Sequence, residues 1–220
     1  MTKIQRNLSS VLKRIEGACE RSGRNPSEVS LITVSKTIPP EIIKEAIDAG
    51  STILGENRPQ ELRDKYPVFP DMRWHIIGHL QTNKIKYIVG KAELIHSVDS
   101  FHLAEEINSY AEKIGVIQKV LLEVNISGEE SKYGLTLDEI PNIIKDMKNL
   151  KNISFQGFMT MAPKYAAEEE IRGIFKEAHK LFVKHKEDGA SVLSMGMSGD
   201  FEIAVEEGAT HVRVGSAIFK

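Results

Sequence analysis

The stretch Leu31-Ile32-Thr33-Val34-Ser35-Lys36-Thr37-Ile38-Pro39-Pro40 separates the two α/β folds that the rest of the chain allows. Its first four residues are apolar or β-branched and predict a buried strand. The residues after them include a lysine and two prolines but no glycine. An open, doubly wound sheet that binds a dinucleotide has a glycine-rich turn directly after its first strand. The lack of such a turn favours a barrel over the open sheet.

Seven further apolar runs follow this strand, separated by segments with helical periodicity. The eight predicted strands are Leu31–Val34, Thr52–Leu54, Trp74–Ile77, Leu94–Val98, Val120–Val124, Ile153–Phe158, Val192–Met195 and His211–Val214. Helical patterns between them include Glu41–Ala49, Ser100–Ile114, Leu137–Met147 and Glu168–His185. Alternating strands and helices are typical of parallel βαβ units. Eight such units in a chain of this length predict a TIM barrel.

A further helix precedes the first strand. Apolar residues between Ile4 and Cys19 recur at helical spacing, and Gly23, Asn25 and Pro26 end the pattern. No linker or low-complexity stretch divides the chain. The predicted fold class is therefore α/β, a single (β/α)8 TIM-barrel domain spanning residues 1–220 with an additional N-terminal helix.

The composition excludes several classes of function. The 220 residues include 29 basic and 31 acidic side chains, a net charge of −2, which gives no general attraction to nucleic acid or anionic membranes. The one cysteine excludes an internal disulfide and a multi-cysteine zinc site. No stretch has the apolar length of a signal-peptide core or a membrane span. We expect a cytoplasmic protein that binds neither nucleic acid nor membrane.

Barrel enzymes place their chemistry at the C-terminal ends of the strands. In this chain polar, small and reactive residues follow the predicted strands. They are Ser35-Lys36-Thr37, Gly55-Glu56-Asn57-Arg58, Gly78-His79-Leu80-Gln81, Ser97-Val98-Asp99, Asn125-Ile126-Ser127, Met159-Thr160-Met161-Ala162-Pro163, Gly196-Met197-Ser198-Gly199 and Gly215-Ser216. The sequence therefore predicts a functional site at this rim.

Lys36 is the most reactive group of the set. A lysine at a barrel mouth is partly desolvated and lies near other cations, which lowers its pKa and frees the amine to attack a carbonyl. The carbonyl can belong to a sugar phosphate, as in an aldolase, or to pyridoxal 5'-phosphate (PLP). A solvated rim lysine without a role is the ordinary alternative.

The turns after the seventh and eighth strands predict a phosphate site. Ser198 and Gly199 precede a predicted helix, Asp200–Glu207, and can present a hydroxyl and backbone N–H groups to an anion. Gly215 allows close backbone approach, and Ser216 adds a second hydroxyl. Asp200 and Glu202 compete with an anion unless they point away. Tight turns without a ligand are the alternative for each segment taken alone.

Three further residues are candidates for contact with a bound ring. Arg213 faces the barrel interior by alternation with its neighbours and needs a partner there, which is either a carboxylate or the pyridine nitrogen of PLP. An arginine at that nitrogen keeps it unprotonated and weakens the cofactor as an electron sink. Asn57 and His79 follow the second and third strands and can line the ring. The histidines His75, His79 and His96 lack the spacing of a metal site, so no metal is expected.

At these residues the sequence resembles the YggS/PROSC family of pyridoxal phosphate homeostasis proteins, which is related to the N-terminal barrel of alanine racemase. The resemblance covers nearly the whole chain. The matching stretches are Val34-Ser35-Lys36-Thr37, Gly55-Glu56-Asn57-Arg58, Trp74–Lys84, Gly157–Pro163, Leu193–Asp200 and Val212–Phe219. The resemblance implies that Lys36 carries PLP as a Schiff base, that Ser198, Gly199, Gly215 and Ser216 hold its phosphate, and that Arg213 meets the pyridine nitrogen. Met195 is a further cofactor-binding candidate.

The resemblance further implies a PLP carrier rather than a catalyst. In alanine racemase a C-terminal β domain supplies the second catalytic base, a tyrosine from the partner subunit, and the 220 residues contain no such domain. The alternatives are a PLP-dependent racemase or decarboxylase of low activity and a cofactor-free Schiff-base aldolase. We expect a monomer or weak dimer, with apo PLP-dependent enzymes as recipients of the cofactor. Lys84 and Lys132 follow strands and can flank the mouth, or they are solvated surface lysines.

Overall fold

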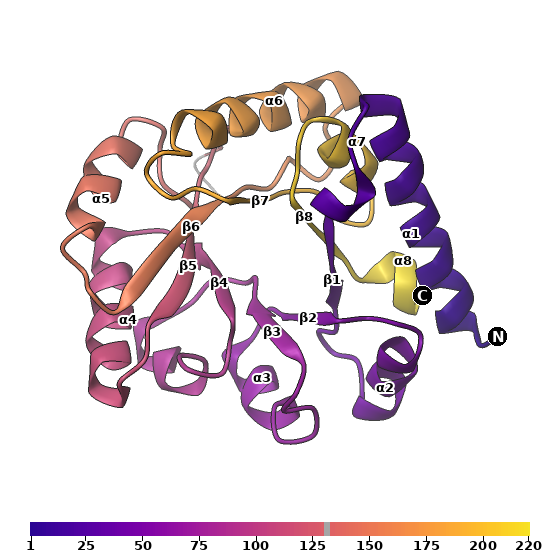
Figure 1. Cartoon of the computed structure of the whole chain (residues 1–220), viewed down its shortest axis with the longest axis horizontal. Coiled ribbons are helices and arrows are strands. Elements are labelled where there is room, and N and C mark those ends of the chain that lie inside the picture. Colours follow the sequence, from indigo (N-terminus) through magenta and orange to yellow (C-terminus); the bar gives the residue numbers. More distant parts are fainter. Residues whose placement is uncertain (130–132) are drawn as a thin grey trace.

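The computed structural model contains a closed barrel of eight parallel strands arranged in sequence order, which confirms the predicted fold (Figure 1). The structure describes residues 1–129 and 133–220. The strands are β1 (Ser30–Val34), β2 (Ile53–Glu56), β3 (Arg73–Ile76), β4 (Leu94–Val98), β5 (Gln118–Glu123), β6 (Ile153–Met159), β7 (Val192–Ser194) and β8 (His211–Val214). Closure occurs at β1, where Thr33 is in register with Leu54 of β2 and with Val214 of β8.

Helices cover the outside of the barrel. They are α1 (Lys3–Ser22), α2 (Pro40–Asp48), α3 (Pro59–Lys65), α4 (Phe101–Ile114), α5 (Ile140–Met147), α6 (Glu168–Lys184), α7 (Phe201–Glu206) and α8 (Ser216–Phe219). Short 3₁₀ helices are η1 (Pro26–Glu28) and η2 (Thr82–Tyr87). The connection from β3 to β4 is thus 3₁₀ rather than α-helical in the residues described.

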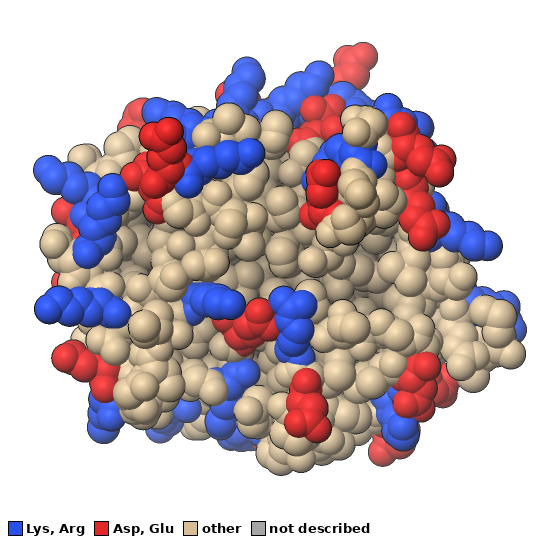
Figure 2. Space-filling model, viewed as in Figure 1, with Lys and Arg blue, Asp and Glu red and all other residues tan. Residues whose placement is uncertain are grey.

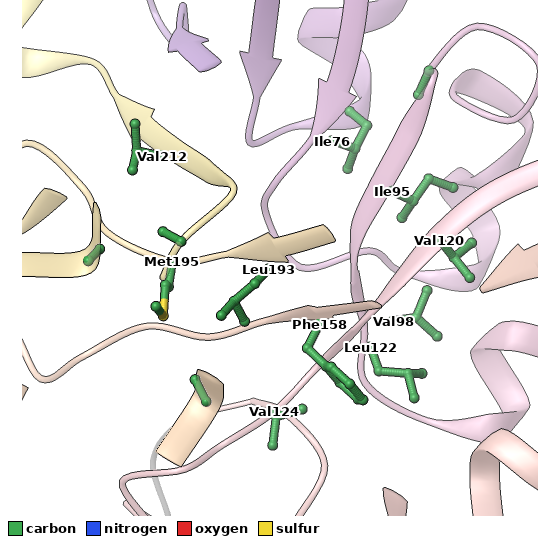
Figure 3. Close-up of a cluster of buried hydrophobic side chains, with 14 of the residues drawn as sticks. Ile76, Ile95, Val98, Val120, Leu122, Val124, Phe158, Leu193, Met195 and Val212 are labelled. Atoms are coloured by element: carbon green, nitrogen blue, oxygen red, sulfur yellow. The ribbon is translucent and has the colours of Figure 1, made fainter. Parts of the chain in front are cut away.

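Side chains alternate between the two faces of the barrel wall, as strand geometry requires. The outward-facing side chains form one large apolar cluster with the helices, and Figure 3 shows part of it, including Ile76, Val120, Leu122, Leu193 and Val212. The interior is different. A small apolar cluster of Leu94, Leu121 and Met159 lies inside the wall, and buried polar side chains fill much of the remaining interior. The helices therefore supply the hydrophobic stabilisation, while the interior carries polar groups.

The N-terminal helix α1 packs against α7 and α8, the two helices that flank β8 in the sequence. It begins with a capping box between Thr2 and Gln5 and ends at Gly23, whose φ of 66° gives the left-handed C-cap. Figure 1 shows α1 beside α7 and α8, so the two ends of the chain lie together. The Asn7 amide donates to the carbonyl of Ile218 at 2.9 Å, and Arg24 Nη1 donates to two carbonyls before β8.

Several element boundaries differ from the sequence expectation. Helix α3 was not predicted, because its seven residues, PQELRDK, contain one apolar side chain and show no periodicity. Strand β7 ends at Ser194, one residue earlier than predicted, and β2 extends to Glu56. Helix α5 starts at Ile140 because Pro141 occupies its first turn, where proline is favoured.

The surface carries both signs of charge. Figure 2 shows blue and red side chains mixed around the margin of the molecule, without a field of one sign. Within the described residues, no helix combines the length and apolar character needed to cross a bilayer.

Gly157 marks the tightest backbone contact of the barrel wall. It pairs with Val192 of β7 at a register shift in the β5–β6 pairing, and its φ is 135°. A Cβ at this position would lie 2.0 Å from the carbonyl oxygen of Val192. Only glycine fits both the backbone angle and this contact.

We therefore expect Gly157→Ala to lower the free energy of unfolding by about 3 kcal/mol or more, because strand β6 must move to accept a methyl group. The matched control is Gly173→Ala in α6, where no atom lies within 4 Å of the new Cβ. That change should raise stability by about 0.5–1 kcal/mol through helix propensity. Urea unfolding followed by circular dichroism measures both, and equal stability of the two variants would contradict this account of β6.

Candidate functional site

Lys36 lies on the C-terminal rim of the barrel, two residues after β1. The strand's inward side chains are Ile32 and Val34, since a Cβ on Gly55 would meet both from inside the wall. Ser35 faces the other way and hydrogen-bonds to Glu56 at 2.7 Å. The Lys36 side chain is exposed, so the partial desolvation expected from the sequence is not present.

A buried ion-pair network holds the turn that carries Lys36. Lys65 Nζ of α3 donates to the carbonyl of Ser35 at 2.8 Å, to Glu56 Oε1 at 2.8 Å and to Glu61 Oε2 at 3.1 Å. Glu61 Oε2 also accepts from the backbone N–H of Thr37 at 2.7 Å. The backbone is therefore fixed immediately before and immediately after Lys36.

This network restrains a strained turn. Thr37 has a φ of 61°, in the left-handed region that a β-branched residue rarely adopts. Burial raises the pKa of Glu56 to about 6, against the opposing effect of its hydrogen bonds from Lys65 and Ser35, and its Oε2 has no partner among the described residues. Sequence reasoning missed the network because α3 gave no helical signal.

The turns after β7 and β8 meet to form one surface at the rim. Ser198 Oγ accepts from the N–H of Gly215 at 3.3 Å and from that of Ala217 at 3.4 Å. In the part of the chain that the structure describes, the N–H groups of Ser198 and Gly199 donate no hydrogen bond. Ser216 is exposed at the start of α8. The predicted residues of the phosphate site thus come together, with two amide donors open.

Two carboxylates, those of Glu202 and Asp200, follow Ser198 and Gly199 in the sequence and were expected to compete with an anion unless they point away. Glu202 points away and pairs with Arg14 of α1. Asp200 Oδ1 accepts from the N–H of Met197 at 2.5 Å, and burial raises the pKa of Asp200 despite that bond and the nearby Arg213.

Met195 does not reach this surface with its side chain. Figure 3 shows it within the apolar cluster between the barrel wall and the helices, and it is fully buried there. The expectation that Met195 contacts a ligand is corrected to this extent, because its alternation with Leu193 turns the side chain outward. Only its backbone belongs to the loop after β7.

Arg213 points into the barrel interior, as alternation in β8 predicts. It is 3% exposed, donates from Nη1 to Ser194 Oγ at 2.7 Å and from Nη2 to the Thr160 carbonyl at 3.0 Å. No carboxylate among the described residues forms an ion pair with it. Burial lowers the pKa of Arg213 to about 10, partly offset by Asp200 and Glu123. The remaining N–H groups can address a ligand acceptor.

The opposite side of the mouth carries titratable groups from β3, β4 and β5. His79 Nδ1 lies 3.0 Å from Asp99 Oδ2, and its ring stacks on Tyr133 with 4.0 Å between the centroids. Asn57, partly exposed, makes no side-chain hydrogen bond to any described residue. The predicted ring contacts Asn57 and His79 therefore lie at the rim, and Asp99 and Tyr133 join them there.

Glu123 at the end of β5 was not predicted as a site residue. It shares the inward face of β5 with Leu121 and is 4% exposed, and its carboxylate forms no hydrogen bond or ion pair with a described residue. Burial raises the pKa of Glu123 to about 7, Asp99 raises it further and Arg213 opposes them. The mouth therefore contains acid–base groups besides Lys36, which the sequence expectation of no second base did not include.

Of the two lysines expected to flank the mouth, Lys84 and Lys132, the structure describes the first. Lys84 belongs to η2, and its Nζ lies 5.9 Å from the centre of the Tyr87 ring. Lys132 lies outside the described residues.

A surface hollow lies at the other end of the barrel, away from this site. It is lined by residues at the N-terminal ends of β3, β4 and β5, including Met72, Ala92 and Gln118. In TIM barrels the N-terminal ends of the strands serve stability, whereas the C-terminal ends carry the chemistry. Another hollow runs along the exposed side of α1.

Comparison with known proteins assigns the family. The family model described as "Alanine racemase, N-terminal domain" matches residues 20–220. A protein of Aquifex aeolicus (strain VF5) named pyridoxal phosphate homeostasis protein is 44% identical over 217 residues, covering 96% of this chain and 95% of the relative. This chain belongs to the YggS/PROSC family of pyridoxal phosphate homeostasis proteins.

Two solved structures resemble this YggS/PROSC chain along its length. A protein of Bifidobacterium adolescentis described as unknown has a TM-score of 0.94 and 38% identity, with 99% of this chain and 94% of that one covered. PipY of Synechococcus elongatus PCC7942, solved with PLP bound, has a TM-score of 0.85 and 33% identity, with 99% and 100% covered. The resemblance inferred from the motifs is confirmed.

The raised pKa of Glu123 predicts a pH dependence of stability. Between the ordinary value of 4.5 and about 7, the folded chain holds the Glu123 proton more tightly than the unfolded chain does. Its contribution to the free energy of unfolding is therefore complete below pH 4.5 and lost as the pH rises through 7. Glu123→Gln has no titrating group at this position, so its free energy of unfolding should not show this loss. Relative to wild type, the variant should therefore become more stable by about 1–3 kcal/mol when the pH is raised from 5 to 8.

Urea unfolding at both pH values measures the difference. Glu139→Gln is the control, because Glu139 is exposed and its pKa is lowered by hydrogen bonds from Thr136. A pH-independent difference between wild type and Glu123→Gln would show that Glu123 titrates normally.

Proposed function

We propose that this chain binds PLP at the C-terminal rim of its barrel, holds it covalently on Lys36 and serves intracellular PLP homeostasis. The observation that carries the proposal is the meeting of three features at one barrel mouth: an exposed amine, two backbone amides that donate to no described residue, and a guanidinium that forms no ion pair with a described carboxylate. These three features match the aldehyde, the phosphate and the pyridine nitrogen of PLP.

The phosphate fits the surface formed by the turns after β7 and β8. The open N–H groups of Ser198 and Gly199 are donors for an anion, and Ser198 Oγ ties this turn to Gly215. Two short segments that share a hydroxyl keep their spacing when the anion binds, so little ordering is needed. Ser216, at the exposed start of α8, is placed to add a further donor.

The pyridine nitrogen fits Arg213. A guanidinium has five N–H donors, of which Ser194 and Thr160 take two. Because Arg213 only donates, it leaves the ring nitrogen unprotonated. Bound PLP withdraws electrons from an attached amine, and an unprotonated ring does so poorly.

Lys36 supplies the covalent link in this proposal. Its exposed amine meets the cofactor without first leaving a buried position, and the Lys65 network holds the adjoining backbone. A fixed turn reduces the entropy lost when the lysine side chain is tied down.

A carrier fits these features better than a catalyst. The Aquifex aeolicus relative is named a homeostasis protein, and Arg213 favours a weak electron sink. The alternative, a racemase or decarboxylase of low activity, draws on one observation: the His79–Asp99 pair and Glu123 provide acid–base groups at the mouth. Recipient enzymes, a cytoplasmic location and a monomeric or weakly dimeric state stay predictions.

Reduction with borohydride should trap a phosphopyridoxyl group on Lys36, and Lys36→Ala should abolish the absorbance of the covalently bound cofactor. Lys84→Ala is the matched control, because it removes an amine near the same rim without touching the proposed link. Peptide mapping by mass spectrometry locates the group. Labelling of Lys84 with Lys36 unmodified would refute the assignment.

The carrier proposal predicts that alanine, serine and the basic amino acids are neither racemised nor decarboxylated at a useful rate. General acid–base assistance contributes about 10²–10⁴-fold per group, and a poor electron sink raises the barrier further. Turnover should thus lie far below roughly 1 s⁻¹. The measurement is α-proton exchange in deuterated water with chiral product analysis, and turnover that vanishes in both Lys36→Ala and Glu123→Gln would make the chain an enzyme.

A further inference from the structure

A chain of hydrogen bonds crosses the barrel interior behind Arg213. Arg213 Nη1 lies 2.7 Å from Ser194 Oγ, Ser194 Oγ lies 2.9 Å from His96 Nδ1, and His96 Nε2 lies 2.9 Å from His75 Nδ1. All four residues are at least 97% buried, and they come from β8, β7, β4 and β3. The site described above uses only the first of them.

The direction of every bond in this chain follows from Arg213. A guanidinium can only donate, so Ser194 Oγ accepts from it. The hydroxyl hydrogen of Ser194 then points to His96 Nδ1, which must be unprotonated. In the opposite direction Ser194 would accept twice, and its buried O–H would have no acceptor among the described residues, which is unfavourable.

The same reasoning fixes both histidine tautomers. A neutral His96 that accepts at Nδ1 carries its hydrogen on Nε2 and donates it to His75 Nδ1. His75 then carries its hydrogen on Nε2, an atom that is buried without a partner in the described part of the chain. The ring of His211 stacks on that of His75, with 6.0 Å between the centroids and 22° between the ring planes.

The histidines stay neutral beside the guanidinium. Burial lowers the pKa of His75 to about 3 and that of His211 to about 4, and it lowers the pKa of His96 well below its ordinary value, with His75 and Arg213 adding to the effect. Arg213 is therefore the one cation among these residues. Its guanidinium interacts with the dipoles of Ser194 and the neutral histidines rather than with a second charged group.

We propose that Ser194, His96 and His75 are positioning residues that fix how Arg213 presents its free N–H groups to the cofactor ring. Ser194 holds Nη1, and His96 keeps the Ser194 lone pair turned toward the guanidinium. His75 holds His96 in the one tautomer that can do so. The inference rests on the proposed function, since it assigns these residues to the ring-nitrogen contact of Arg213.

The first test needs no cofactor. Two-bond ¹H–¹⁵N correlation spectra of the full-length apo-protein at pH 7 distinguish the imidazole tautomers. We expect His96 and His75 to be neutral and protonated at Nε2. A proton on Nδ1 of His96, or a charged His96, would overturn the proposal, whether or not the protein binds PLP.

The second test measures the effect on the cofactor. Ser194→Ala should weaken PLP binding about ten-fold or more, because Arg213 loses a charge-assisted hydrogen bond, and should shift the absorption maximum of the bound cofactor. The control is Thr33→Val, which removes a buried hydroxyl bonded to Ser51 at 2.8 Å on the outer face of β1. It should change stability but neither the absorption maximum nor the histidine spectra.

Unchanged affinity and absorption in Ser194→Ala would also overturn the proposal. Failure of wild-type protein to take up PLP would instead refute the proposed function. In that case the apo-protein spectra still decide the direction of the hydrogen-bond chain.

Discussion

Closure of the sheet at β1 is the constraint on which the rest of this structure depends. Because β1 pairs with both β2 and β8, the ends of all eight strands meet in one ring. Lys36 from the beginning of the chain and Arg213 from its end can share a mouth only under this condition. An open sheet with the same strand order would leave them on opposite edges.

The barrel divides its stabilisation between two faces. Apolar packing against the helices holds the wall from outside, so the interior can bury polar groups at a cost that the outer cluster offsets. Two buried polar systems support the candidate site, one on each face of the wall. Lys65 with Glu56 and Glu61 fixes the Lys36 turn from behind the wall, whereas Ser194, His96 and His75 line up behind Arg213 within it. Each system ends at a residue of the candidate site.

Features that depend on a pattern of neighbouring residues, such as the strands and the alternation of their side chains, could be predicted from the sequence. The strand pattern defined the barrel, and alternation in the stretch from His211 to Val214 turned Arg213 inward. Contacts between distant elements could not be predicted. The bond between Ser194 and His96 depends on the register of β4 and β7, which only closure sets, and Lys65 lies in a helix too short and polar for a periodic signal. The outward packing of the Met195 side chain could not be predicted either, since Met195 lies one residue beyond the end of β7.

The seam between the first and last strands has a consequence for synthesis on the ribosome. Helix α1 packs on α7 and α8, and β1 pairs with β8. The segments that are synthesised first therefore meet these partners only after the last segments have been synthesised. A nascent chain that has exposed Lys36 still lacks Arg213 and Gly215. Vectorial translation therefore separates the synthesis of these residues in time, and the mouth that they share is complete only after the barrel closes.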